Sequence, residues 1–253
     1  LAGGLIAAIL GPEVSRYSFD FFHDYIYLAT YLFAAIIQII NFVILIFIKI
    51  KKPQLSKKSH RPLSDILLQK NLIIAILAAA VGYSLMSFIM TATPLQIVNV
   101  CKLGDSASAT VIQWHVIAMF APSFFTGTII NSLGNRKVMM IGLFLYAFSI
   151  SFTIIGQTIE HFWIALFLCG LGWNFLYVGG SDIIAKSAFP EERAKVQGVT
   201  DFIIFIFVAT GSFLAGALHS SLGWEIMMFY TSIPIFILFV SIIMIKFDEI
   251  KAS

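Results

Sequence analysis

GTIINSLGNRK, residues 127–137, is a short basic turn between two apolar runs. Each run is about twenty residues long, which lets an α-helix cross the hydrocarbon core of a bilayer. Because the turn is so short, the two helices must lie antiparallel and side by side. Its Lys and Arg side chains also indicate which side of the membrane the turn occupies. The stretch therefore predicts a membrane protein with closely packed helices.

The composition agrees with a membrane protein. The 253 residues are 59% hydrophobic and 11% charged, with a mean hydropathy of +0.94, whereas about a quarter of the residues in a soluble domain are charged. Two cysteines, Cys101 and Cys169, form neither a disulfide framework nor a metal-ligand spacing. The net charge of +3 resides in short loops beside the spans. We therefore expect no cofactor, no metal and no nucleic-acid partner.

Seven apolar runs have the length of membrane spans. They fall at 26–48, 72–93, 110–130, 138–156, 162–185, 196–218 and 226–245. Backbone polar groups must be satisfied internally in lipid, so each run is predicted to be a helix. The opening segment, 1–14, resembles the last turns of an eighth span. Since no Met or basic leader precedes it, we expect the chain to be a fragment that begins inside a helix.

The positive residues predict the orientation. Fourteen of the sixteen Lys and Arg residues fall on one side of the predicted spans, and only Arg16 and Lys102 fall on the other. Because cytoplasmic loops carry the excess of Lys and Arg, the 49–71 loop and the C-terminus are predicted to be cytoplasmic. We therefore expect a multi-pass protein of the cell membrane. We expect this loop to be a solvated basic linker near anionic lipid, with a short interfacial helix around 64–69. The alternative is that the loop is a regulatory binding site.

The turn resembles the signature loop of the major facilitator superfamily, G-x-x-x-D-R-x-G-R-R/K. Gly127 and Gly134 take the two glycine positions, Asn131 the acidic position, and Arg136 and Lys137 the basic end. The segment 189–198, FPEERAKVQG, is similar to the cytoplasmic turn between the tenth and eleventh spans of that family, and Gly11-Pro12 to the end of its fifth span.

The resemblance implies an all-α membrane fold. In this interpretation residues 1–48 end the N-terminal bundle, 49–71 link the bundles, 72–245 form the C-terminal six-helix half of a two-bundle transporter, and 246–253 are a cytoplasmic tail. It implies a secondary transporter that moves a small organic solute by alternating access, with the missing N-terminal half, membrane lipid and a co-transported proton as partners.

The resemblance also implies a conformational latch on the cytoplasmic face. Its members are Gly127, Asn131, Gly134, Arg136, Lys137, Glu192 and Arg193. We expect Arg136 to pair with Asp201 or Glu192, and the helix of 196–218 to begin at about Pro190, which suits a first helical turn. Asn131 in place of an acid predicts a weaker latch in this half.

Polar and aromatic residues inside spans are candidate solute contacts, because they are costly in lipid. The substrate-binding candidates are Gln113, Trp114, His115, Trp173, Asn174, Tyr177, Ser84 and Ser87. Trp173 and Tyr177 are four residues apart and form an aromatic pair on one helix face. Hydrogen bonding between helices is the alternative for each of these residues.

Two residues are candidates for proton coupling. His115 titrates near neutral pH when unperturbed, and Asp201 lies about one turn inside its predicted span. Asp182 and Lys186, four residues apart, are expected to form a structural ion pair.

Two other classes of protein remain open at this point. Seven spans are also the topology of a seven-helix receptor or photoreceptor, although the last span has no mid-membrane Lys for retinal. An intramembrane enzyme lacks support, because paired carboxylates, H-E-x-x-H and G-x-S-x-G are absent from the sequence. We therefore predict that the chain is not an enzyme.

Overall fold

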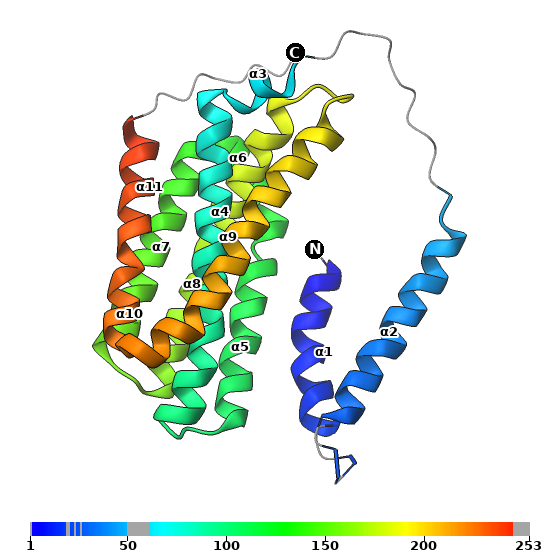
Figure 1. The fold of residues 1–253 in the computed structure, drawn as a ribbon, viewed down its shortest axis with the longest axis vertical. Coiled ribbons are helices and arrows are strands. Elements are labelled where there is room, and N and C mark those ends of the chain that lie inside the picture. Colours follow the sequence, from blue (N-terminus) through cyan, green and yellow to red (C-terminus); the bar gives the residue numbers. More distant parts are fainter. Residues whose placement is uncertain (1, 19–20, 23, 26, 50–60, 245–253) are drawn as a thin grey trace.

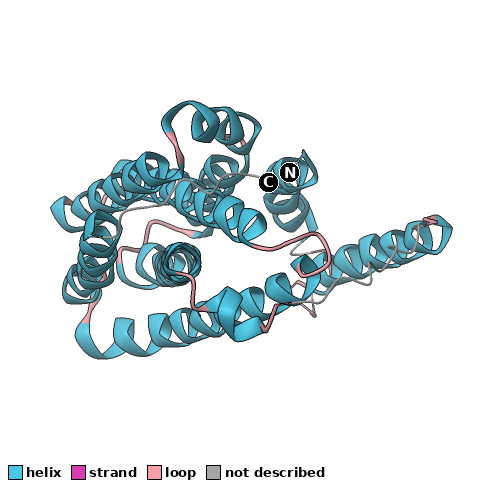
Figure 2. Ribbon diagram, turned by 90° about the horizontal axis from the view of Figure 1, so that it is seen from above, coloured by secondary structure: helices cyan, strands magenta, loops and turns pink. Residues whose placement is uncertain are grey.

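The computed structural model describes residues 2–18, 21–22, 24–25, 27–49 and 61–244. Figure 2 shows that this part of the chain consists of helices and loops, without strands. The helices are α1 (Ala2–Ser18), α2 (Leu28–Phe47), α3 (Leu63–Leu67), α4 (Lys70–Pro94), η1 (Leu95–Val100), α5 (Asp105–Phe120), α6 (Ser123–Leu133), α7 (Asn135–Ile155), α8 (Ile159–Ser187), α9 (Arg193–Leu222), α10 (Trp224–Tyr230) and α11 (Ser232–Met244).

Six helical segments are long and apolar enough to cross a membrane. They are α2, α4 with η1, α7, α8, α9, and α10 with α11; α5 and α6 would add a seventh if together they form one span. The all-helical membrane fold is confirmed, whereas the predicted count of seven complete spans and part of an eighth stays a prediction. The tail 246–253 and residues 50–60 of the predicted linker lie outside the described residues.

The predicted unbroken helix over 110–130 is wrong in one respect. α5 ends at Phe120 and α6 begins at Ser123, with a bend of 44° between them. Pro122 lies at this break, and it has no N–H to continue the backbone ladder of the helix. A short helix is present near the predicted range 64–69, as α3, whereas its position at the membrane interface stays a prediction.

Helix α8 lies at the centre of the bundle, where it packs against α7, α4 and α5 (Figure 1). Small residues allow this close approach: a Cβ at Gly180 would lie 2.7 Å from the Ala75 carbonyl oxygen, and one at Gly170 would lie 2.6 Å from that of His115. Such close backbone contact is typical of helices that pack in lipid.

α1 and α2 lie beside this bundle. α1 packs along α5, while α2 leans away from the bundle in Figure 1. None of the most apolar window of α2 is buried. A helix that is apolar all round and exposed on all sides must face lipid or further helices.

Candidate solute-binding site

Five aromatic side chains from four helices form one cluster, which we call the aromatic patch. The rings of Trp173 and Tyr177 on α8 stack with centroids 5.0 Å apart and planes at 8°. Tyr83 of α4 packs edge-on against both, at 5.3 Å and 5.4 Å. Phe120 of α5 contacts Trp173 at 6.0 Å, and Phe205 of α9 contacts Tyr83 at 5.8 Å.

The patch is only partly covered by the rest of the chain. Trp173 is buried, Tyr83, Phe120 and Tyr177 are half-buried, and 54% of Phe205 is exposed. The Trp173–Tyr177 pair was predicted from its spacing. The three other members were not, because nothing in the sequence distinguishes them among 25 Phe and 8 Tyr residues.

The predicted candidates Gln113, Trp114 and His115 do not meet in one site. The Gln113 amide donates to the Ile9 carbonyl of α1 at 3.2 Å, and the Trp114 ring packs on Trp163 at 5.7 Å. His115 is fully buried against α8. Consecutive helical residues point about 100° apart, so three in a row leave the helix in three directions.

His115 has one bonded and one unbonded ring nitrogen. Nδ1 lies 2.7 Å from the Leu166 carbonyl oxygen, which can only accept, so Nδ1 carries the hydrogen. Nε2 has no hydrogen-bond partner among the described residues. A proton on Nε2 would place an unpaired charge in a packed interior, which is costly. The geometry therefore supports a packing role for His115. A role of His115 in proton coupling stays a prediction.

Asn174 is buried and joins α8 to the bend between α5 and α6. Its Nδ2 donates to the Met119 carbonyl oxygen at 2.7 Å and to the Ser123 hydroxyl at 2.5 Å. Its Oδ1 accepts from the Thr126 hydroxyl at 2.6 Å. These bonds use the whole side chain for interhelical contact, which was the alternative interpretation of this residue.

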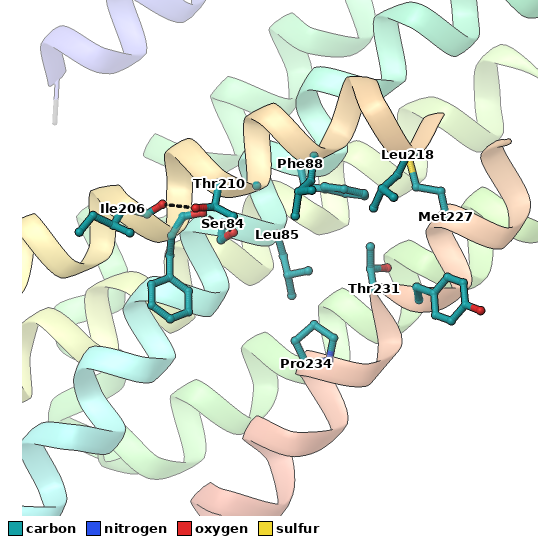
Figure 3. Close-up of a pocket in the computed structure, with 13 residues that line it drawn as sticks. Ser84, Leu85, Phe88, Ile206, Thr210, Leu218, Met227, Thr231 and Pro234 are labelled. Carbon is teal, nitrogen blue, oxygen red and sulfur yellow. Dashed lines mark hydrogen bonds between the residues drawn. The ribbon is translucent and has the colours of Figure 1, made fainter. Parts of the chain in front are cut away.

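Ser84 and Ser87 likewise connect helices. The Ser84 hydroxyl donates to the Phe207 carbonyl of α9 at 2.8 Å, and Ser87 bonds the Ser212 hydroxyl at 2.6 Å. Figure 3 shows Ser84 in the wall of a cavity of about 340 Å³ between α4, α9, α10 and α11. Thr210 and Thr231 also line it; Thr210 donates to a carbonyl of its own helix, and Thr231, between α10 and α11, donates to the Met228 carbonyl of α10. With these three hydroxyls engaged, the cavity suits apolar groups rather than a polar solute.

Asp201 lies on α9, where it is half-buried. It accepts a hydrogen bond from Gln197 at 2.7 Å and is within electrostatic range of Tyr177. Arg136 does not reach it: the guanidinium donates to the Ile243 carbonyl of α11 at 2.8 Å. The predicted pairing of Arg136 with Asp201 or Glu192 is therefore wrong, because Arg136 starts α7 on the side that faces α11.

The signature turn itself is a tight reversal. Gly134 separates α6 from α7 with a φ of 83°, a conformation that favours glycine. Asn135 next to it donates to the Asp182 carboxylate at 2.8 Å, and Lys186 pairs with the same carboxylate at 2.6 Å. The predicted Asp182–Lys186 pair is thus confirmed. Four other predicted latch residues, Asn131, Lys137, Gly127 and Arg193, are exposed.

Glu192 has a partner that the sequence did not indicate. The Arg61 Nη2 lies 2.8 Å from the Glu192 Oε2, and the guanidinium lies 4.5 Å from the centre of the Phe189 ring. The Glu192 carboxylate also accepts from the Phe189 backbone N–H at 3.1 Å. These contacts hold Glu192 in the turn before α9, so the helix begins at Arg193 and not at the predicted Pro190.

This ion pair changes the acidity of Glu192. The hydrogen bond from Arg61 lowers the pKa of the Glu192 carboxyl to about 2, with a smaller contribution from the Phe189 N–H. The same bond raises the pKa of Arg61. The charged pair therefore persists throughout the physiological pH range.

The sequence of this chain is similar to those of known proteins. Residues 98–252 match the model of the Major Facilitator Superfamily. The riboflavin transporter RfnT of Brucella anthropi is 40% identical over 229 residues, which are 89% of this chain and 57% of that protein. An uncharacterised transporter of the same type from Bacillus subtilis, YdeG, is 35% identical over 153 residues, 58% of this chain and 35% of its own.

A weaker relationship extends to a third relative. The multidrug resistance protein MdtL of Shewanella oneidensis is 22% identical over 156 residues, 59% of this chain and 39% of its own. The chain thus spans between about a third and three fifths of the length of these relatives.

Proposed function

Because the chain belongs to the major facilitator superfamily, we propose that it is the C-terminal part of a secondary transporter for a flat heteroaromatic solute. Membership supports a multi-pass membrane transporter with a small-molecule substrate and no enzymatic role. It does not favour the alternative of a seven-helix receptor or photoreceptor. In the proposed mechanism this part rocks against an N-terminal helical bundle, and the solute path runs between them.

The aromatic patch carries the proposal for the solute. Two parallel rings, with two edge-on rings and one tilted ring beside them, offer flat surfaces on which a fused heteroaromatic ring can stack. Such stacking contributes about 1–3 kcal/mol per ring when a base lies on an aromatic side chain. A relative that matches 89% of this chain is a riboflavin transporter, and riboflavin has a flat fused ring. We therefore propose riboflavin or a compound with a similar ring.

The proposal also includes the membrane topology, the cytoplasmic latch and the site of proton coupling. Residues 1–48 belong to the opposite bundle, and the 49–71 linker and C-terminus are cytoplasmic in the cell membrane. The cytoplasmic latch then contains Glu192 with Arg61 as its partner, and Asn135 with Asp182 beside the signature turn. Of the two proton-coupling candidates, Asp201 has the better geometry, since it is half-buried beside the patch while His115 is enclosed.

Binding of riboflavin to the purified product of the complete gene tests the proposal. We expect Trp173→Ala and Tyr177→Ala each to weaken binding between about 5-fold and 150-fold, as follows from the loss of one stacked ring. Quenching of flavin fluorescence on titration measures the dissociation constant, and uptake of radiolabelled riboflavin into proteoliposomes measures transport.

The matched control is Phe148→Ala. Phe148 is an aromatic residue on α7 that is 59% exposed, and its ring lies outside the patch. The proposal is wrong if the wild-type protein binds no riboflavin, or if the α8 variants bind it as tightly as the wild type does.

A further inference from the structure

The carboxylate of Asp201 lies near the aromatic patch, on the side toward the start of α9. Asp201 is eight residues from the start of α9 at Arg193, about 12 Å along the helix axis at 1.5 Å per residue. It is therefore inside a candidate membrane span and not in a loop.

The register of α9 turns Asp201 toward the patch. Asp201 precedes Phe205 by four residues, so the two side chains share one face of the helix. Phe205 contacts Tyr83, which in turn contacts Tyr177, and Tyr177 is within electrostatic range of Asp201. Phe207 and Thr210, in contrast, line the apolar cavity on another side of α9.

The charge of Asp201 is not neutralised inside this part of the protein. Within the described ranges, the three ion pairs are Arg16–Glu13, Arg61–Glu192 and Lys186–Asp182. Asp201 takes part in none of them and accepts from the neutral Gln197 amide of its own helix. An ionisable side chain within a span is costly unless it faces a partner or a solute path. A carboxylate also has about four acceptor positions, and one hydrogen bond leaves most of them open.

We propose that Asp201 is a specificity-determining residue that accepts a hydrogen bond from a donor group of the solute while the ring of the solute stacks on the aromatic patch. This inference rests on the proposed function and names the chemistry of the solute more closely. The solute combines a flat ring with an N–H or O–H donor near one end. A flat hydrocarbon or a ring that carries only acceptors is excluded by the uncompensated carboxylate.

Riboflavin has two kinds of hydrogen-bond donor. Analogues that lack one kind show which of them binds Asp201. Its ring edge carries an imide N–H, which is blocked in 3-methylriboflavin. Its ribityl chain carries hydroxyls, which are absent from lumiflavin. We expect the wild-type protein to bind one of these analogues about tenfold or more weakly than riboflavin, because a hydrogen bond to a charged group is lost. Equal affinity for all three ligands overturns the inference and requires no variant.

Asp201→Asn then tests the residue, with fluorescence titration of the protein from the complete gene. The expected result is riboflavin binding about tenfold weaker than in the wild type. The analogue that lacks the relevant donor should bind the variant and the wild type with nearly equal affinity. Glu225→Gln is the control, since Glu225 is exposed in the first turn of α10, at the opposite end of the bundle from the start of α9.

The outcomes separate this inference from the proposed function. Absence of riboflavin binding in the wild type overturns both. Normal riboflavin affinity of Asp201→Asn overturns the inference alone, and if that variant also loses uptake driven by a pH gradient, Asp201 belongs to proton coupling. Asp201→Glu keeps the carboxylate, so recovery of affinity in that variant supports the inference where Asp201→Asn unfolds.

Discussion

At the scale of the residue, the Arg61–Glu192 pair joins the segment before α3 to the turn between α8 and α9. It combines an ion pair of 2.8 Å with a guanidinium placed over the Phe189 ring. Glu192 is buried although it is charged, while its neighbour Glu191 is exposed. A buried carboxylate depends on its partner, whereas an exposed one is solvated by water.

We expect Glu192→Gln to lower the free energy of unfolding by an amount on the order of 1–3 kcal/mol, because a charged hydrogen bond is lost. Glu191→Gln should have little effect. Thermal unfolding of both variants in the same detergent compares them. Equal losses of unfolding temperature for the two variants would show that the pair adds nothing.

The pH dependence of this stabilisation follows from the pKa of Glu192. The folded-state pKa is about 2, below the ordinary value of about 4.3. The stabilisation of the folded state by the charged Glu192 is therefore fully present above about pH 4.5 and is lost as the pH falls toward 2. We expect the difference in unfolding temperature between wild type and Glu192→Gln to be smaller at pH 3 than at pH 7. A difference that does not change with pH would contradict the assigned ion pair.

At the scale of the element, the bend between α5 and α6 is fastened to α8 by one side chain. Pro122 interrupts the backbone ladder, and Asn174 donates to the carbonyl of Met119 beside the break. A carbonyl freed by a helix break must find another donor when it is surrounded by lipid or protein.

Asn174→Ala should therefore destabilise the protein by about 1–3 kcal/mol, since a buried carbonyl loses its donor. Asn131→Ala makes the same chemical change at an exposed position of α6 and should stay within about 0.5 kcal/mol of the wild type. Unfolding temperatures in detergent decide between them. If Asn174→Ala unfolds at the wild-type temperature, Asn174 does not support the bend.

At the scale of the whole molecule, the charge distribution predicts that the η1 end of the bundle lies outside the cytoplasm. Cys101, which follows η1, is half-buried, and Cys169 in the centre of α8 is fully buried. Cys101 can therefore serve as a probe of membrane orientation, and Cys169 as its buried control.

A membrane-impermeant maleimide added to intact cells should label Cys101 and leave Cys169 unmodified until the protein is denatured. Cys101→Ser should remove the labelling at this position in intact cells. Labelling of Cys101 only in inverted vesicles would reverse the predicted topology.

Much of this fold was predictable from local sequence, because span length and hydropathy do not depend on tertiary contacts. The apolar runs and the four-residue spacing of Trp173 and Tyr177 predicted the helices and the stacked pair. The bend at Pro122 was missed, since the apolar run continues through it. The partners of Arg136 and Glu192 were also missed, because each lies more than 100 residues away in the sequence.

The contrast between α2 and α8 has a consequence for biosynthesis. The most apolar window of α2 has a mean hydropathy of 2.3 with none of it buried, while that of α8 reaches 1.6 with 56% buried. Insertion by the translocon depends on the hydrophobicity of each segment. α2 can therefore enter the bilayer without neighbours, whereas α8, with its glycines and Asn174, depends on α4 and α7. Substitutions that weaken α4 or α7 should therefore reduce the amount of protein in the membrane before they alter the stacked rings of α8.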